Sequence, residues 1–225
     1  MTKDTVSKKR IRLQPHDREK QILDAAIEFY SEVGMRGTTR ELATRLGVTQ
    51  GLIYRYFADK EALINRVYEA VFVERWAPDW EEKLKNRNEP LRRRLVKFYF
   101  NYARIIHTKE WVRIFLLSGF EQNLIQNKYR VLLEKRLMPT LILEMRNSFN
   151  LPKQDKKINE KEIELIISLQ AMIFHLGVRK WIYRVPVPPD TEEQISIYVD
   201  MFLYGLKQLY KNKGAIEPIS NKYEN

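Results

Sequence analysis

The sequence of 225 residues contains no cysteine, which excludes disulfide bonds, thiolate zinc sites and cysteine nucleophiles. No apolar run approaches the roughly 18 residues of a membrane span, and the polar start, MTKDTVSKKR, lacks the apolar core of a signal peptide. These absences predict a cytoplasmic protein without membrane contact. With 44% hydrophobic and 31% charged residues, the chain is apolar enough to fold into one or two packed domains.

Catalytic motifs are also missing. His16, His107 and His175 lie far apart and lack partners at metal-binding spacing, and no G-x-S-x-G, phosphate-binding glycine loop or Rossmann fingerprint occurs. A lone histidine usually has a structural role. We therefore predict no enzymatic activity, no metal site and no cofactor; an enzyme with a basic surface stays the weakest of three hypotheses.

Acidic residues are too few to balance the basic ones. The chain has 40 Lys and Arg against 29 Asp and Glu, a net charge of +11. Such an excess favours an anionic partner, most often nucleic acid, although a merely basic surface would also account for it. Residues 1–15 form a basic arm, predicted either to lie along a phosphate backbone or to be a frayed terminus. The arm's charges are Lys3, Lys8, Lys9, Arg10 and Arg12 against Asp4.

What is present is helical periodicity, and we predict an all-α protein. Apolar residues from Ile22 to Val33 form one face of a long first helix, with Asp17 as its cap and Gly34 at its end. Thr38-x-x-Glu41 reads as a capping box that opens a second helix. Gly47 and Thr49 then supply a tight turn and a cap for a third. Two short helices joined in this way are a helix-turn-helix.

The third helix has a face that a core does not require. Gln50, Gly51, Tyr54 and Arg55 lie opposite the apolar Ile53. A glycine permits close approach of another backbone, glutamine and arginine donate to base edges, and a tyrosine hydroxyl donates to phosphate. The pattern predicts that this helix reads DNA; the alternative is a solvated face.

These residues stand in a pattern that resembles the DNA-binding domain of the tetracycline-repressor (TetR) family of transcriptional regulators. The matching positions are Gly34, Thr38, Thr39, Leu42, Ala43, Gly47, Val48, Thr49, Gly51, Ile53, Tyr54, Tyr56, Phe57, Lys60 and Leu63. The chain departs from the family in two places: the segment before Arg40 is one residue shorter, and Leu52 stands where a small or polar residue is usual. The resemblance implies a DNA-binding domain at 16–77. We predict DNA contacts from Arg36, Thr38, Thr39, Arg40, Thr49, Gln50, Gly51, Tyr54, Arg55, Tyr56 and Lys60.

The resemblance further implies a helical ligand-binding and dimerisation domain at 78–212, followed by a flexible tail at 213–225. Amphipathic stripes support helices there, with an interruption at Pro139 and a surface connection at 152–157. Two long apolar helices, near 159–183 and 190–210, should pair antiparallel. Their wide apolar surface predicts a homodimer, with burial inside one subunit as the alternative. The predicted interface is Ile167, Phe174, Trp181, Tyr198, Phe202, Leu206 and Leu209.

Aromatic residues in the second domain predict a pocket for a small apolar or aromatic effector, although a filled core would use the same residues. The predicted lining is Phe98, Tyr102, His107, Trp111, Phe115, Phe174 and His175. The sequence thus predicts a DNA-binding transcriptional regulator, a ligand-responsive repressor that acts as a homodimer on a palindromic double-stranded operator. The alternative is a nucleoid-associated, DNA-organising protein of the same fold without a ligand.

Overall fold

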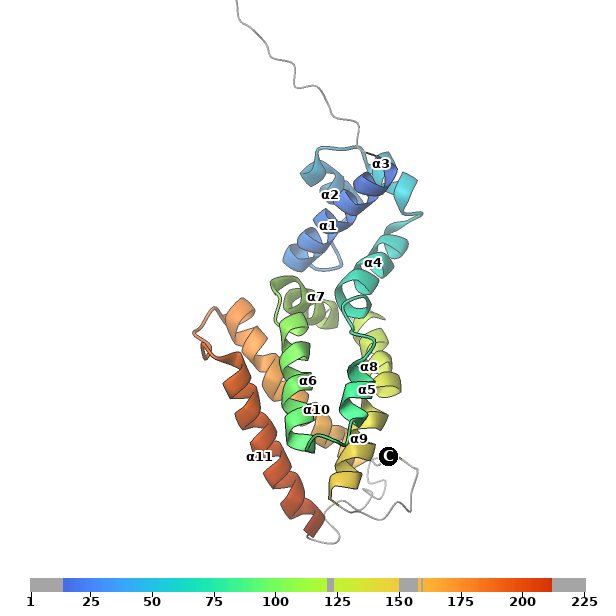
Figure 1. Cartoon of the computed structure of the whole chain (residues 1–225). Helices are drawn as coiled ribbons and strands as arrows, with labels where there is room; N and C mark the ends of the chain where they lie inside the picture. The colour runs from blue at the N-terminus through green and yellow to red at the C-terminus, as the bar shows by residue number, and fades with distance from the viewer. Residues whose placement is uncertain (1–13, 121–123, 150–157, 159, 212–225) are drawn as a thin grey trace, which may run out of the picture.

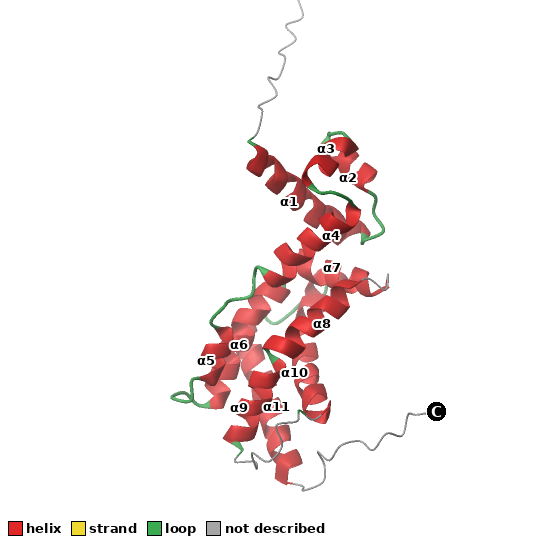
Figure 2. Cartoon of the chain, turned by 90° about the vertical axis from the view of Figure 1, so that its right-hand side faces the viewer, coloured by secondary structure: helices red, strands yellow, loops and turns green. Residues whose placement is uncertain are grey.

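The structure, a computed structural model, describes residues 14–120, 124–149, 158 and 160–211, and this part of the chain is helical without any strand (Figure 2). The basic arm, the surface connection and the tail predicted from the sequence lie almost wholly outside these residues. The helices are α1 (Pro15–Val33), α2 (Thr39–Leu46), α3 (Gln50–Tyr56), α4 (Lys60–Tyr68), α5 (Trp80–Lys85), α6 (Leu91–Ile106), α7 (Lys109–Phe120), α8 (Leu124–Arg136), α9 (Met138–Ser148), α10 (Glu160–Val178) and α11 (Thr191–Lys211). Two π-helical turns, η1 (Glu69–Val73) and η2 (Arg179–Tyr183), extend α4 and α10.

Helices α1, α2, α3 and the start of α4 gather at one end of the molecule (Figure 1). With seven and eight residues, α3 and α2 are too short to be stable alone, so they depend on burial against their neighbours. The shared core contains side chains that are almost without solvent exposure: Ile22, Ala26, Tyr30, Leu42, Ile53 and Leu63. This packing fixes the angle at which α3 is held.

The two ends of α1 test two predictions. Gly34 ends the helix with a φ of 81°, and its N–H donates to the carbonyl of Tyr30 at 3.0 Å, as expected. The predicted cap at Asp17 is wrong, because the helix already begins at Pro15. Proline's fixed φ suits the first helical position, and Asp17 lies inside the first turn, where its negative charge favours the helix dipole.

Below this group, α4 and η1 lead into the larger part of the molecule (Figure 1). There α11 packs along α6 and α10, while α9 contacts α5, α8 and α10. The predicted interruption at Pro139 is confirmed, because α8 ends at Arg136 and α9 begins at Met138. The predicted pair of long helices is also confirmed: α10 and α11 contact each other and run in opposite directions (Figure 1). The division into two domains at residue 77 stays a prediction.

One helix of the described residues is long and apolar enough on average to cross a membrane, although no unbroken apolar run reaches that length. Glu160–Tyr183 has a mean hydropathy of 1.3 over its most apolar window, 39% of which is buried. Length and composition are the only criteria here, and the core helix of a globular protein meets them as well. In the structure α10 packs against α6, α7, α9 and α11, which is the position of a core helix.

Candidate nucleic-acid interface and effector cavity

The predicted caps of α2 and α3 are present. The hydroxyl of Thr38 accepts a hydrogen bond from the Glu41 N–H at 3.2 Å, and the Glu41 carboxylate accepts one from the Thr38 N–H at 2.7 Å. Gly47 ends α2 with a φ of 65°, and the Thr49 hydroxyl accepts from the Leu52 N–H at 3.3 Å. The capping box therefore closes although the segment before α2 is one residue short.

Positive charge surrounds α3. The hydrogen bonds from Thr38 hold the pKa of Glu41 below its usual value, so this carboxylate is committed to the cap. Arg45 pairs instead with Glu32 of α1. The ammonium group of Lys60 lies 3.4 Å from the carbonyl oxygen of Arg36, to which it donates. The cations left with exposed or half-exposed side chains near α3 are Arg36, Arg40, Arg55 and Lys60.

The outer face of α3 is free of packing. Ile53 is fully buried, whereas Gly51, Tyr54 and Arg55 are exposed and Gln50 is half-buried. A Cβ atom added to Gly51 would meet no heavy atom of the described residues within 4 Å. Packing among the described residues therefore does not require glycine at this position.

Thr39 does not lie on that face. It is 3% exposed, and its hydroxyl lies 2.8 Å from the Tyr54 hydroxyl and accepts a hydrogen bond from the Gln50 amide at 2.7 Å. The prediction that Thr39 itself contacts DNA is thus corrected: burial makes it a bridge between α2 and α3. Its role is to hold Gln50 and Tyr54 in place.

The helix-turn-helix also matches known proteins. Residues 22–67 match the family model described as "Bacterial regulatory proteins, tetR family". This segment of the chain is therefore similar to the DNA-binding part of tetR-family regulators. It is 35% identical over 95 residues to the tetracycline repressor protein class A from transposon 1721 of Escherichia coli, and 30% identical over 74 residues to the HTH-type transcriptional regulator BetI of Burkholderia ambifaria.

These relatives match over only part of their length. The matched segments make up 39% and 32% of this chain, and 42% and 38% of the relatives. Similarity of the whole fold comes from a solved TetR-like transcriptional regulator from Rhodococcus sp. RHA1. Its TM-score is 0.60 at 19% identity, with 86% of this chain and 100% of that chain covered. The remaining helices therefore also follow the architecture of TetR-family proteins.

Side-chain hydrogen bonds connect the helix-turn-helix end of the molecule to the larger part. Arg113 on α7 donates to the carbonyl oxygens of Ser31 and Glu32 in α1, at 2.6 and 3.3 Å. On the other side, Lys128 of α8 donates to the Asn65 side chain of α4 at 2.6 Å. Helices α7 and α8 are thus bound to the two helices that carry α2 and α3.

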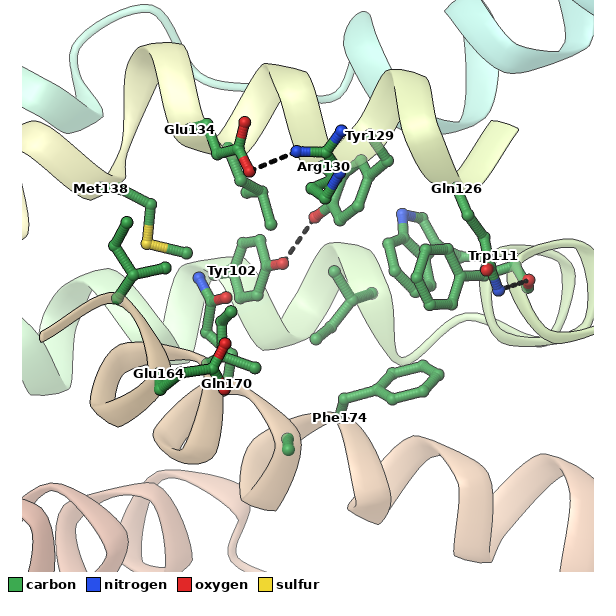
Figure 3. A pocket seen from close by; sticks show the side chains of 16 residues that line it. Tyr102, Trp111, Gln126, Tyr129, Arg130, Glu134, Met138, Glu164, Gln170 and Phe174 are labelled. Atoms are coloured by element: carbon green, nitrogen blue, oxygen red, sulfur yellow. Dashed lines mark hydrogen bonds and ion pairs between the residues drawn. The ribbon is translucent and has the colours of Figure 1, made fainter. Parts of the chain in front are cut away.

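The same two helices line a cavity of about 370 Å³ (Figure 3). Figure 3 shows Tyr129 and Glu134 above the cavity on α8, and Gln170 and Phe174 below it on α10. Its wall is mostly aromatic and aliphatic, which is typical of a small-molecule pocket. The lining residues are Tyr102, Ile106, Trp111, Phe115, Gln126, Tyr129, Arg130, Leu133, Glu134, Met138, Ile163, Glu164, Ile167, Gln170, Ala171 and Phe174.

Of the predicted pocket residues, Tyr102, Trp111, Phe115 and Phe174 line this cavity, and the other three do not. Phe98 lies behind Tyr102, with the two rings stacked 5.8 Å apart. The imidazole Nε2 of His107 lies 2.8 Å from the carbonyl oxygen of Ile173, where it holds α6 to α10. His175 is exposed and contacts the Tyr183 ring. The periodicity gave the correct helices but not the side of each helix that faces the cavity.

Several cavity residues were missed because they are polar or lie on α8, where the sequence offered no aromatic stripe. Tyr129 is one; its hydroxyl lies 2.5 Å from that of Tyr102, and burial raises the pKa of Tyr102 to about 12. Phe72 of η1 packs on the same cluster, with ring centroids 5.0 Å from Trp111 and 5.6 Å from Tyr129. The continuation of α4 therefore touches the wall of the cavity directly.

The predicted dimer interface needs a correction on α11. Phe202 and Leu206 are only 9% and 1% exposed, because they face the core of their own subunit. The exposed apolar row of α11 is instead Ile197, Met201 and Tyr204. The other predicted positions are partly or largely exposed, namely Ile167, Phe174, Trp181, Tyr198 and Leu209.

Proposed function

We propose that this chain is a sequence-specific DNA-binding transcriptional regulator. The observation that carries the proposal is the outer face of α3, on which the exposed Arg55 and Tyr54 stand beside an unobstructed Gly51, with Gln50 held next to them by Thr39. A helix of this kind enters the major groove with its first residues on base edges, while nearby cations bind phosphates. Arg36, Arg40 and Lys60 are the cations available for that purpose.

We further propose that it acts as a homodimer. Ile197, Met201 and Tyr204 recur at i, i+4 and i+7 on α11 and are 45%, 59% and 70% exposed. An apolar row of this length is unfavourable in water and fits a second copy related by a two-fold axis. Two copies would offer two α3 helices to a palindromic operator, with half-sites about one helical turn apart or somewhat more.

A small apolar or aromatic effector is proposed for the cavity, and repression relieved by that effector is the proposed mode of action. The support is the position of α7, which carries Trp111 and Phe115 of the wall and, between them, Arg113 bound to α1. An effector that favours one placement of α7 would move α1 and hence α3. A hundredfold change in operator affinity requires about 2.7 kcal/mol of coupling. We expect the protein in the bacterial cytoplasm, on the nucleoid when bound to DNA.

The test begins with the selection of duplexes bound by the full chain from a random pool. Selected and scrambled duplexes are then titrated against the protein and two variants. Arg55→Ala should lose about 1 to 3 kcal/mol on the selected duplex and relax base preference, because a base contact is removed. Lys60→Ala should weaken binding to all sequences alike and lower the salt slope by about one.

A matched control is Arg93→Ala, which removes the same charge from an exposed site on α6, far along the chain from α3. It should change neither base preference nor affinity for the selected duplex. Equal binding of selected and scrambled duplexes by the unchanged protein would contradict the proposal and favour the DNA-organising alternative.

A further inference from the structure

The cavity contains a buried hydrogen-bond donor that no group in the described structure satisfies. Gln170 of α10 is 8% exposed, and its amide nitrogen Nε2 has no hydrogen-bond partner. The residue lines the cavity from below (Figure 3). Buried donors are rarely left unpaired, because the lost hydrogen bond to water destabilises the folded protein. A ligand with an acceptor oxygen at this point would supply the missing partner.

A second donor lies across the cavity. The hydroxyls of Tyr102 and Tyr129 are buried and lie 2.5 Å apart. Two hydroxyl groups bring two protons, and the bond between them uses one. Among the described residues the other proton has no acceptor, so the pair also offers a donor to a bound molecule. Gln126, which also lines the cavity, uses one of its amide N–H groups for the Phe115 carbonyl at 3.1 Å.

The charges at the cavity limit the ligand further. Arg130 is the single cation in the described lining, and it is paired with Glu134 at 2.5 Å. Glu164, the second carboxylate of the lining, is exposed at the mouth. An anionic ligand would therefore find a carboxylate and no unpaired cation. A cation inside would find no buried carboxylate, because both glutamates of the lining are exposed.

From these contacts we infer that the cavity takes an uncharged, largely aromatic molecule with a carbonyl or ether oxygen, and that the Gln170 amide recognises that oxygen. The aromatic part would lie against Trp111, Phe115 and Phe174, whose rings already pack edge-to-face or stacked. The inference rests on the proposed function, in that the cavity is the proposed effector site. It adds the class of the effector and the residue that selects it.

The experiment uses three fluorescent probes with related ring systems. They are prodan, an uncharged naphthalene ketone; 2-dimethylaminonaphthalene, which lacks the ketone; and anilinonaphthalene sulfonate, an anion. Each is titrated into the full chain and into Gln170→Met, which keeps the side-chain length and removes the amide. We expect Gln170→Met to weaken prodan binding about three- to tenfold, the range of one neutral hydrogen bond, and to leave the ketone-free analogue within twofold. The sulfonate should bind most weakly.

A second variant locates the bound probe. Ala171→Trp adds a bulky side chain to an exposed part of the lining without removing a hydrogen bond, so it should fold normally and reduce prodan binding. Melting temperatures of both variants are measured in parallel, and Gln170→Met should melt no lower than the unchanged protein. Three results would overturn the inference: equal prodan affinity in Gln170→Met, tighter binding of the sulfonate than of prodan, or prodan binding unaffected by Ala171→Trp.

The same titrations are repeated with the selected duplex present, which separates this inference from the proposed function. Prodan binding that follows the expected pattern but leaves DNA affinity unchanged supports the ligand class and refutes the ligand switch. Loss of selective DNA binding in the unchanged protein, with prodan binding intact, refutes the proposed regulator alone.

Discussion

The guanidinium group of Arg113 on α7 donates a 2.6 Å hydrogen bond to the carbonyl oxygen of Ser31 in the last turn of α1. The last carbonyls of a helix lack partners inside it, and a cationic donor there also favours the helix dipole. Arg113 thus caps α1 from another part of the fold. Because Trp111 and Phe115 flank it on the same helix, one helix carries both the cap and part of the cavity wall.

Removal of this cap should loosen the joint between the two ends of the molecule. Arg113→Met keeps the aliphatic stem and loses two hydrogen bonds from a charged donor. We therefore expect the free energy of unfolding to fall by about 1.5 to 3 kcal/mol. Urea unfolding measures this loss. The matched control is Lys109→Met on the same helix. The ion pair of Lys109 with Glu32 is 3.8 Å long and partly exposed, so this substitution should lower the free energy of unfolding by less than about 1 kcal/mol. Equal effects of the two variants would contradict a specific role for Arg113.

A substitution at Gly51 should affect DNA binding without weakening the fold. In Gly51→Ala the new Cβ meets open space, and alanine is favoured over glycine in a helix by up to about 1 kcal/mol, so thermal stability should rise or stay unchanged. The added methyl group would stand between α3 and an approaching DNA backbone, and we expect operator affinity to fall about tenfold or more, which is at least 1.4 kcal/mol. Fluorescence anisotropy with the selected duplex checks this. Unchanged affinity would mean that no backbone approaches α3 there.

Dimer formation and subunit folding should respond to different residues of α11. Tyr204→Asp puts a charge on a side chain that is 70% exposed in one subunit, so the monomer should fold while the dimer dissociates. Leu206→Asp buries an unpaired charge in the subunit core, because Leu206 is 1% exposed, and the protein should unfold. Analytical ultracentrifugation and circular dichroism distinguish the two outcomes. A dimeric Tyr204→Asp variant would place the interface elsewhere.

From the surroundings of His107 we predict that the folded protein becomes less stable in mild acid. Burial lowers its pKa, and the positive charge of Lys180 acts in the same direction, although the bond to the Ile173 carbonyl partly opposes both. The unfolded chain, with a histidine pKa of about 6.5, therefore binds a proton more readily than the folded one. Stability is full above that pKa and falls as pH decreases through it toward the lower folded value.

Urea midpoints measured between pH 7.5 and pH 5.5 test this dependence, since the pKa values of the Glu41, Glu89 and Glu144 carboxylates are lowered from the ordinary 4.5 and these groups titrate below that range. His107→Gln, which keeps a donor for the Ile173 carbonyl, should flatten the profile. If the urea midpoint of His107→Gln falls as steeply with decreasing pH as that of the unchanged protein, other groups cause the acid sensitivity.

Local signals in the sequence were sufficient for the DNA-binding end. Thr38 and Glu41 at capping-box spacing, followed by Gly47 and Thr49, specify two helix starts and a turn through contacts within a few residues. Such contacts do not depend on the rest of the fold. Thr39 was misjudged because its burial arises from Gln50 and Tyr54, which reach it from the next helix.

The exposed row of α11 and the lining of the cavity depend on packing between helices that are distant in the sequence. On α11 nearly every turn has apolar residues on more than one side, so periodicity alone does not tell which row meets α6 and which meets water. The cavity depends on five helices at once, and Gln170 looks like any polar helix residue until its neighbours are known. The pattern predicts a cap at Asp17 because hydrophobic periodicity does not reveal that Pro15 already starts α1.

The π-helical turn η1 makes the arrangement of the molecule sensitive to the number of residues in this segment. In this turn the N–H of Glu74 donates to the carbonyl of Glu69, five residues back, so the segment holds one residue more than an α-helix would. Each α-helical residue turns the chain by about 100°. Deletion of a single residue from Glu69–Val73 would restore the α-helical pattern and rotate Trp76 and all that follows against α3. At this point a one-residue deletion would change the rotation of one end of the molecule relative to the other, while the side chains of α3 and of the cavity stayed chemically the same.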